Sequence, residues 1–460
     1  MPISALADRP VLLLGGGREG RATLEWLQQH RHRAPLHLLG DQPPDPPLAG
    51  APWVSAADLG PLLTPATVVI RSPGFAPAHP LRRLLDASPV EQTTATRLAL
   101  AELRAAGLPL IGVTASKGKS TISSLTDLLL QAAGHASELA GNIGVPLLAR
   151  VEAMIAAAAP VVIELSSYQC DDLMPGEGPQ QVVFGTLFPE HLDWHGSLSA
   201  YYAAKARLLA AAPAGAHLHV DWRARTVLEQ HGLAAVLARH DVSLEWVNRP
   251  AGLHVAGHGF ADGSRCLLEH ADCRMPGLHN RENACLAFAA ARRHGALPAH
   301  LAQVLRDFGG LPFRLQDEGR HGGIRWINDS ISTAPEAACA GLEALQGSVS
   351  VLIAGGQDRG YDYAPLAAAM VRWQVRHLVA LPESGPAIAA ALKASSAVHA
   401  AGAPPLVSVA ANLAEAVARA RQLAPPGSTC LFSPAAPSYH AWPGFEARGR
   451  DFRTLVLSLA

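Results

Sequence analysis

Short apolar runs alternate with longer segments of mixed, helix-like composition along most of the chain. Runs of this length and content are typical of parallel strands that helices cover on both faces. Their alternation with helical segments favours α/β domains built on parallel sheets. The predicted strands are Val11–Leu14, Pro35–Leu39, Val68–Arg71, Leu110–Val113, Val161–Leu165, Val182–Thr186, Val349–Ala354 and Thr429–Phe432.

The length of 460 residues predicts about three domains at roughly 150 residues each. A new series of strands begins after the turn signals near Thr94–Thr96 and again near Gly309–Arg314. The proline-rich stretch Asp41–Pro52 reads as a surface loop, and the irregular stretch Asp241–Arg274 carries mixed strand signals. We expect domains over residues 1–97, 98–310 and 311–460.

Composition narrows the class of protein. The net charge of -1 offers no general attraction to nucleic acid or to an anionic membrane, so we expect neither partner. No stretch reaches the ~20 apolar residues of a membrane span, and the first apolar run is too short for a secretion signal. The cysteines form no CxxC pair, which is typical of reduced thiols in the cytoplasm. They are Cys170, Cys266, Cys273, Cys285, Cys339 and Cys430.

A glycine-lysine loop follows the predicted strand Leu110–Val113. Backbone N–H groups of such a loop surround a phosphate, and the following helix N-terminus adds positive potential. Lys119 can reach the β- and γ-phosphates, and Ser120 can place its hydroxyl on Mg²⁺. The strict pattern requires glycine where this chain has Val113, so a structural turn is the alternative. The loop reads Thr114, Ala115, Ser116, Lys117, Gly118, Lys119, Ser120 and Thr121.

Two further candidates stand at the ends of the next predicted strands. Glu164 ends an apolar run at the sheet edge where α/β folds bind ligands, which makes it a candidate Mg²⁺ ligand. A helix cap or a salt bridge would explain Glu164 equally well. His191 and His195 have the spacing of a zinc pair, but the nearby proline and glycine argue against a helix there. His191, after its strand, is the better candidate of the two histidines.

The N-terminal stretch Gly15–Gly20 fits G-x-G-x-x-G after a strand, and Asp41 follows at about the expected ~20-residue offset. Alone, this pattern indicates a dinucleotide-dependent oxidoreductase using NAD(P). That alternative leaves the Lys119 loop and the third domain unexplained.

Taken together, nine stretches resemble the Mur ligase family, most closely its MurD-type branch, over essentially the whole chain. Each stretch is weak alone, but their order and spacing match the family. They are Thr114–Thr121, Gly141–Pro146, Glu164–Gln169, Glu190–Asp193, Ala203–Lys205, Gly277–Asn283, Leu311–Arg314, Trp326–Ser330 and Ser433–Ser438.

The resemblance implies a Rossmann-like N-terminal domain for a UDP-sugar, a P-loop ATPase-like central domain and a Rossmann-like C-terminal domain that brings the amino acid. It implies that ATP phosphorylates the alanyl carboxylate of UDP-N-acetylmuramoyl-L-alanine, and that glutamate attacks the acyl phosphate, leaving ADP and phosphate. Such a ligase works in peptidoglycan precursor synthesis in the cytoplasm, and we expect a monomer. Mg²⁺ and lysine must neutralise charge when two anions meet.

The resemblance also assigns roles. Lys119, His191 and Lys205 are implied to be catalytic, with Ser120, Glu164, His191 and Lys205 around two Mg²⁺ ions. Lys205 matches a lysine carried as a carbamate (N6-carboxylysine), which requires a neutral and hence desolvated amine; otherwise Lys205 is a surface lysine. Positions near ATP are Asn283, Arg314 and Asp329. Positions near the sugar nucleotide are Gly15, Gly17, Arg18, Asp41, Ser72, Gly74 and Asn142.

Three residues depart from the pattern of D-glutamate ligases. Ile331 replaces a lysine, Lys117 an asparagine and Phe313 a histidine. Losing a cation should rearrange a carboxylate site, yet matching positions hold Thr333, Arg359, Ser438 and Phe445. These departures are similar to a branch that adds L-glutamate, which we favour, with D-glutamate as the alternative because spacing does not encode chirality.

A third reading is a binding module that has lost catalysis. Retention of Lys119, Glu164, His191 and Lys205 argues against it.

Overall fold

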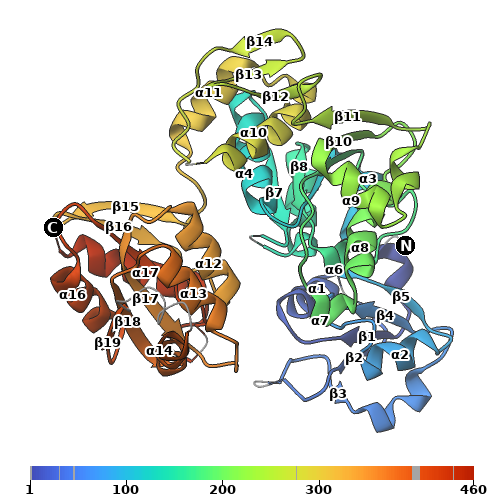
Figure 1. The fold of residues 1–460 in the computed structure, drawn as a ribbon. Coiled ribbons are helices and arrows are strands. Elements are labelled where there is room, and N and C mark those ends of the chain that lie inside the picture. The colour runs from blue at the N-terminus through green and yellow to red at the C-terminus, as the bar shows by residue number, and fades with distance from the viewer. Residues whose placement is uncertain are drawn as a thin grey trace. The chain divides into compact units, whose positions relative to one another are not determined.

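The computed structural model describes residues 3–30, 32–44, 47–143, 145–275, 277–395, 405–438 and 440–459. Asp45 and Pro46 of the expected surface loop, Gly144 of the stretch Gly141–Pro146 and the side chain of Asp193 lie outside this description. The chain divides into two compact units, Met1–Asp307 and Phe308–Ala460 (Figure 1).

The first sheet has five parallel strands in the order β3-β2-β1-β4-β5. Strand β1 is buried along its whole length, and the short loop of residues 15–17 joins it to helix α1. The carboxyl ends of β1 and β4 therefore lie side by side, with Leu14 opposite Arg71. The elements are β1 Val11–Leu14, β2 Leu36–Leu39, β3 Trp53–Val54, β4 Val68–Arg71, β5 Glu91–Thr93, α1 Arg18–Gln29, α2 Pro80–Asp86, α3 Ala95–Ala105 and the 3-10 turns Ile3–Leu6, Ala56–Asp58 and Gly60–Leu62.

The second sheet has six parallel strands in the order β11-β10-β9-β6-β8-β7. Its strands are β6 Leu110–Thr114, β7 Glu138–Gly141, β8 Val161–Glu164, β9 Gln181–Phe184, β10 His217–Asp221 and β11 Ser243–Val247. A small antiparallel sheet of β12 Leu253–Ala256, β13 Gly259–Asp262 and β14 Arg265–Leu268 accounts for the irregular stretch in the sequence.

Helices cover this second sheet, and α4 packs beside α10 (Figure 1). The central strand β6 lies between β8 and β9, so the loop after β6 is flanked by the ends of both neighbours. The helices are α4 Lys119–Ala132, α5 Val151–Ala157, α6 Ser167–Cys170, α7 Leu192–His195, α8 Leu198–Ala211, α9 Trp222–Gln230, α10 Leu278–Ala291 and α11 Pro298–Asp307, with 3-10 turns at Leu147–Arg150, Ala234–Leu237 and Arg292–His294.

The unit Phe308–Ala460 has its own sheet, whose six described strands have the order β15-β16-β20-β17-β18-β19. Among these described strands, β15 is antiparallel to its neighbour and the others pair in parallel. Two apolar clusters form its core. The elements are β15 Gln316–His321, β16 Ile324–Asn328, β17 Val349–Gly356, β18 His377–Glu383, β19 Leu406–Val409, β20 Thr429–Phe432, α12 Pro335–Ala344, α13 Ala364–Arg372, α14 Ser384–Ala394, α16 Leu413–Leu423 and α17 Phe445–Leu457.

The predicted strands are confirmed, with β1, β4 and β20 at the predicted bounds and the others within two residues. One apolar cluster contains buried residues of both the first and the second sheet, for example Leu13 and Ile163. Helix α3 runs unbroken across the expected boundary at residues 97 and 98. The two boundaries between the three expected domains remain predictions. No helix in the described ranges has the length and apolar character that crossing a bilayer requires.

Candidate active site

The phosphate loop connects buried strand β6 to helix α4, which begins at Lys119. Gly118 caps the helix with φ 84°, a conformation that disfavours a side chain. A Cβ at Gly118 would also lie 2.7 Å from Oδ1 of Asn283. Asn283 on α10 is thus packed directly against the loop, and the helix N-terminus is suited to an anion. The alternative of a structural turn has less support, because Lys119 and Lys205 both donate hydrogen bonds to this loop.

Lys119 bends back over the loop. Its Nζ donates to the carbonyl oxygens of Ala115 at 2.8 Å and Ser116 at 3.1 Å. Hydrogen bonds hold the loop to the segments that follow both neighbouring strands. Thr114 Oγ1 donates to the carbonyl of Leu165 after β8, and the N–H of Ser116 donates to the carbonyl of Thr186 after β9. The lysine ammonium therefore lies at a fixed, half-buried loop.

Glu164 ends β8, opposite Val113 of β6, and is 1% exposed. Its Oε1 accepts a hydrogen bond from Asn142 Nδ2 at 2.7 Å, while Oε2 is buried with no hydrogen-bond partner among the described residues. The cap of the following helix α6 is Ser166, so Glu164 is not a helix cap. A buried carboxylate oxygen without a donor is suited to a cation.

Lys205 on α8 is 1% exposed, so it is not the surface lysine that the sequence alone left open. Its Nζ donates to the carbonyl oxygen of Ala115 at 2.8 Å and to Thr114 Oγ1 at 3.4 Å. Burial, and then the charge of Lys119, lower the pKa of Lys205 to about 7. Much of the Lys205 amine is therefore neutral near pH 7.

His191 lies after β9 in an exposed position with φ 54°. Its ring is 5.1 Å from that of Tyr168 and 6.1 Å from that of Tyr201. The expectation that no helix forms here is wrong in detail, because α7 makes one helical turn from Leu192 to His195. Ring nitrogen Nε2 of His195 lies 3.0 Å from Ser167 Oγ, which gives that histidine a structural partner.

No group of three or more His, Cys, Asp and Glu side chains in the described part of the chain is arranged to hold a metal ion. The expected set contributes only Glu164 and His191 of these types, beside Ser120 and Lys205. A cation there would depend on phosphate oxygens and on a modified lysine for its remaining ligands.

Two residues beside the loop escaped the sequence analysis as site residues. The hydroxyl of Tyr201 lies 2.8 Å from Ser116 Oγ and 3.4 Å from Glu190 Oε2. Glu190 also forms an ion pair with Lys117. Tyr201 stands four residues before Lys205 on α8, so the i, i+4 spacing would have placed both on one helix face. Burial raises the pKa of Tyr201, which keeps its hydroxyl neutral.

The glycine-rich loop of the first sheet lies between β1 and α1. Gly15 has φ 100°, and a Cβ on Gly20 would lie 1.9 Å from the carbonyl oxygen of Gly15, so both glycines permit a tight turn. Gly17 and Arg18 are exposed at the start of α1. Ser72 donates its N–H to the carbonyl of Leu14, which holds the loop after β4 against β1.

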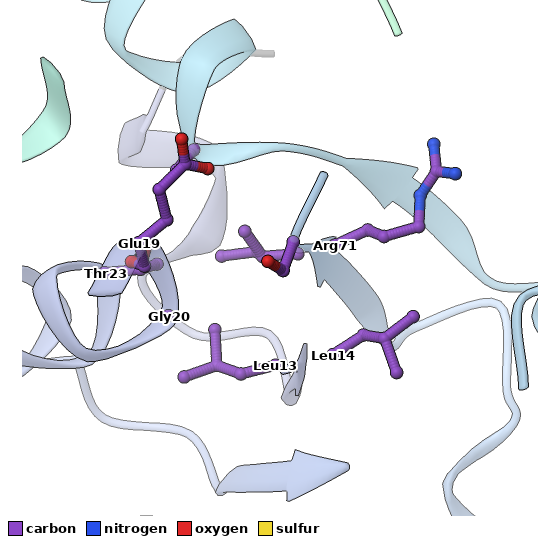
Figure 2. A pocket seen from close by; sticks show the side chains of 9 residues that line it. Leu13, Leu14, Glu19, Gly20, Thr23 and Arg71 are labelled. Carbon is purple, nitrogen blue, oxygen red and sulfur yellow. Dashed lines mark hydrogen bonds between the residues drawn. The ribbon is translucent and has the colours of Figure 1, made fainter. Parts of the chain in front are cut away.

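The substrate candidates Asp41 and Gly74 lie at the same edge of the first sheet. Asp41 Oδ2 lies 3.3 Å from His79 Nε2, and Gly74 accepts a hydrogen bond from Trp194 Nε1 at 3.4 Å. A small cavity of about 10 Å³ lies under this edge. In Figure 2 the polar ends of Glu19 and Arg71 extend away from Leu13 and Leu14 of β1. The cavity is large enough for one water, so a sugar nucleotide would bind outside it.

In the second unit, Asp329 lies just after β16 and is 3% exposed. Its carboxylate accepts hydrogen bonds from Ser332 Oγ at 2.5 Å, Ser433 Oγ at 2.8 Å and the N–H of Leu315 at 3.1 Å. Burial raises the pKa of Asp329 to about 6 against these hydrogen bonds. Arg314 is exposed nearby and lowers that pKa slightly.

Arg448, which the sequence analysis missed, connects segments that carry three of the four amino-acid candidates of this unit. Arg448 is buried and donates to the carbonyl oxygens of Ser330 and Ala436. Ser330 Oγ in turn donates to the carbonyl of Phe445. Arg448 therefore ties the segments that carry Thr333, Ser438 and Phe445. Arg359 is exposed after β17.

The departures Phe313 and Ile331 lie next to each other, because the N–H of Ile331 donates to the carbonyl of Phe313. Phe313 has φ 60° and packs on Gly449, where a Cβ would lie 2.3 Å from its ring. Two replacements that are separate in the sequence thus change one place in the fold.

Comparison with known proteins bears on these residues. Residues 113–291 match the Mur ligase middle domain, and residues 313–436 match the Mur ligase glutamate ligase domain. A UDP-N-acetylmuramoyl-L-alanine–L-glutamate ligase of Xylella fastidiosa is 37% identical over 99% of this chain and 97% of its own length. A ligase of the same name from Salinispora tropica is 36% identical over the full length of both chains. This chain belongs to the Mur ligase family.

Solved structures support the fold of this Mur ligase. The UDP-N-acetylmuramate-alanine ligase MurC of Thermotoga maritima covers 98% of the chain with a TM-score of 0.57 and 16% identity. The MurF ligase of Thermotoga maritima in complex with ADP covers 99% with a TM-score of 0.55 and 12% identity. The predicted family, the three-domain α/β fold class and the class of ATP-dependent acid–amino-acid ligase are confirmed. The oxidoreductase interpretation of the glycine-rich loop is wrong.

Proposed function

We propose that this Mur ligase joins L-glutamate to UDP-N-acetylmuramoyl-L-alanine in peptidoglycan precursor synthesis, consuming ATP and releasing ADP and phosphate. The similarity that carries the proposal extends over whole chains, and the relatives from Xylella fastidiosa and Salinispora tropica have this activity in their names. D-Glutamate is the alternative amino acid.

The reaction begins by making the alanyl carboxylate a better electrophile. Transfer of the γ-phosphoryl group of ATP gives it a phosphate leaving group, and the amine of glutamate then attacks the carbonyl carbon. Two anions approach each other in the first step, so the site must supply positive charge. Lys119 supplies it from the phosphate loop, and the N-terminus of α4 adds to it.

ATP binding is assigned to the phosphate loop and, by the resemblance, to three further residues. The loop residues Thr114, Ala115, Ser116, Lys117, Gly118, Lys119, Ser120 and Thr121 surround the phosphates. Asn283, which packs on Gly118, supports the nucleotide side of the loop. Arg314 and Asp329 are assigned to phosphate and ribose.

The residues fit Mg²⁺, of which two ions are proposed. Glu164 offers a buried oxygen with no donor in the described structure, and Ser120, His191 and Lys205 complete the protein's contribution. Bound Mg²⁺ would offset the negative charge of the phosphates and of the carboxylate. Asn142 holds the second oxygen of Glu164 and so orients the carboxylate.

Lys205 is proposed to carry a carbamate. Formation of a carbamate joins the nitrogen of a neutral amine to the carbon of CO₂ and releases one proton. A pKa of about 7 makes the neutral amine available. The product is an anion in contact with the phosphate loop. An anion at this place can bind a cation, whereas the ammonium of an unmodified lysine would repel both the cation and Lys119.

The sugar nucleotide is assigned to the first sheet. Gly15, Gly17 and Arg18 form the turn at the start of α1, where a diphosphate is favoured. Asp41, Ser72 and Gly74 stand at the same edge, and Asn142 at the central sheet meets the substrate's acid end.

Glutamate is assigned to Thr333, Arg359, Ser438 and Phe445. Arg359 can hold a carboxylate through two parallel N–H donors. The altered place at Phe313 and Ile331 lies beside this set and is where the two enantiomers would be distinguished. We further propose that the enzyme works in the cytoplasm as a monomer.

The decisive experiment offers purified protein ATP, Mg²⁺ and UDP-N-acetylmuramoyl-L-alanine with L-glutamate or D-glutamate in separate reactions. Phosphate release and the mass of the product are measured. We expect ligation with L-glutamate. Product formed with D-glutamate and none with L-glutamate would show that D-glutamate is the amino acid that is added. No phosphate release with either amino acid would refute the proposed activity.

A further inference from the structure

A buried ion pair joins the first sheet to the segment after Glu164. Arg71 ends β4, and its Nη2 binds Asp172 Oδ1. The two side chains are 10% and 6% exposed. Arg82 on α2 lies on the other side, 3.8 Å from Asp172 and 3.5 Å from Asp171. Two cations of the first sheet thus face two carboxylates that follow α6.

This pairing is a poor device for stability alone. Burial raises the pKa of Asp172 even though Arg71 and Arg82 oppose that change, and burial lowers the pKa of Arg82. Arg71 Nε and Nη1 are buried with no hydrogen-bond partner among the described residues. Removing charges from water offsets most of what such a pair gains. Its position in the fold accounts for it better.

Both ends of the pair adjoin the proposed site. Arg71 directly precedes Ser72 and stands three residues before Gly74, both of which are assigned to the sugar nucleotide. Asp172 follows Glu164 through the single turn of α6. Residues 164–172 and the ion pair of Asp172 with Arg71 therefore connect the carboxylate at the phosphate loop with the loop assigned to the nucleotide.

Two neighbouring contacts stiffen this connection. Gln169 of α6 donates to Glu19 Oε1 at 2.8 Å, and Glu19 stands in the first turn of α1 (Figure 2 shows its carboxylate). Asp171 binds Arg207 through its backbone carbonyl at 2.6 Å and its side chain at 3.4 Å. Arg207 is on α8, two residues after Lys205. The segment after Glu164 is thus held to both sides of the site.

We propose that the Arg71–Asp172 pair is a positioning device for the reaction. It sets the separation between the loop that grips the sugar nucleotide and the phosphate loop, so that the alanyl carboxylate meets the γ-phosphate. The inference rests on the proposed function. Reactive groups must approach within a few tenths of an ångström of the productive geometry, and a displacement of ~1 Å can cost ~100-fold in rate.

The chain offers a matched control. Arg97 on α3 binds Glu177 through two hydrogen bonds of 2.7 and 2.8 Å, and these side chains are 20% and 28% exposed. This pair also links a helix that follows the first sheet to the segment after α6. It adjoins neither the nucleotide loop nor Glu164, so its loss should affect folding without displacing the substrate.

The experiment compares full-length parent, Asp172→Asn, Asp172→Glu and the control Glu177→Gln. It measures kcat, the KM values for the sugar nucleotide and ATP, the Kd of UDP by calorimetry, and the Tm. We expect Asp172→Asn to lower kcat ~30-fold or more, with the Kd of UDP and the KM for ATP within about threefold of the parent. Glu177→Gln should keep kcat within about twofold.

Asp172→Glu separates position from stability, because it keeps the charge and lengthens the side chain by one methylene. We expect a Tm near that of the parent with kcat still reduced ~10-fold. This variant also answers the question if Asp172→Asn fails to fold. Parent-like kcat in Asp172→Glu, or equal kcat in Asp172→Asn and Glu177→Gln, would overturn the proposal.

A rise in the Kd of UDP with kcat unchanged would overturn it too, since Arg71 would then serve binding. An inactive parent with either glutamate refutes the proposed function instead, so the two failures are distinct.

Discussion

Lys119 and Lys205 donate to the same carbonyl oxygen, that of Ala115, each at 2.8 Å. Two ammonium groups at one acceptor repel each other, and Lys205 is the more deeply buried of the two. The pKa of Lys205 falls to about 7 for these reasons, while Lys119 stays at the more accessible mouth of the loop. We therefore expect Lys119 to provide the cation for the phosphates and Lys205 to provide the amine that is modified.

Modification of Lys205 can be observed directly. We expect protein incubated with ¹³C-bicarbonate to show a carbamate carbon signal that Lys205→Ala lacks. We also expect Lys205→Ala to lose ~100-fold or more in kcat and to regain part of it with acetate or formate, since these place a carboxylate where the carbamate stood. Full activity in Lys205→Ala without any added acid would contradict a catalytic role.

Lys119 is expected to act on ATP alone. Lys119→Ala should lower the ligation rate by ~100-fold or more, because the transferring phosphoryl group would lose the positive charge that we assign to Lys119. The Kd of UDP, whose proposed site lies on the first sheet, should stay unchanged. Calorimetry with UDP and assays of phosphate release check both parts, and ligation at the parent's rate would remove the loop from the mechanism.

A substitution at Glu164 is expected to lower activity without lowering thermal stability. Glu164→Gln keeps an acceptor for Asn142 and removes a buried charge that has one unpaired oxygen. We expect a Tm equal to or above that of the parent, because no hydrogen bond is lost and less charge is desolvated. We expect a kcat ~100-fold lower and a higher Mg²⁺ requirement. A lower Tm with unchanged Mg²⁺ dependence would show Glu164 to be structural.

Asp329 predicts a pH dependence of stability. Its pKa rises from 3.8 to about 6 on folding, so the folded chain holds the proton more tightly than the unfolded chain. The contribution of Asp329 to the free energy of unfolding is therefore full below about pH 4 and is lost as pH rises through about 6. The total loss is roughly 3 kcal/mol. Asp329→Asn does not titrate, so it should lack this loss.

Urea unfolding of the full chain between pH 4 and 7 checks the expectation for Asp329. The difference in unfolding free energy, variant minus parent, should grow with pH and level off above about pH 7. A difference that is constant over this range would mean that Asp329 is ionised throughout.

The sequence predicted the strands and their end residues well, because buried parallel strands are continuous apolar runs. Glu164 could be placed at a sheet edge for that reason. The different partners of its two oxygens could not be predicted, because Oε1 is bound by Asn142 from the end of another strand and Oε2 is buried with no partner among the described residues. Likewise the G-x-G-x-x-G pattern predicted a tight turn and helix start, but the pattern alone pointed to the wrong cofactor class.

Other features depend on packing between distant segments. Burial of Lys205 follows from α8 lying against the phosphate loop, and periodicity along α8 does not identify that neighbour. Tyr201 carries an i, i+4 signal with Lys205 that acquires meaning only beside Ser116. Arg71 and Asp172 are a hundred residues apart, so nothing in the local pattern connects them. The single turn of α7 formed despite the proline and glycine on its flanks, because both lie outside the turn.

The apolar cluster shared by the first and second sheets bears on how this enzyme can be recombined. A fragment cut after the first sheet would expose the buried leucines of α3. A first sheet taken from another ligase would have to match these leucines. Residues 308–460 enclose their own cores. Chimeras with relatives that attach other amino acids are therefore best joined near residue 308, where the chain divides into its two compact units.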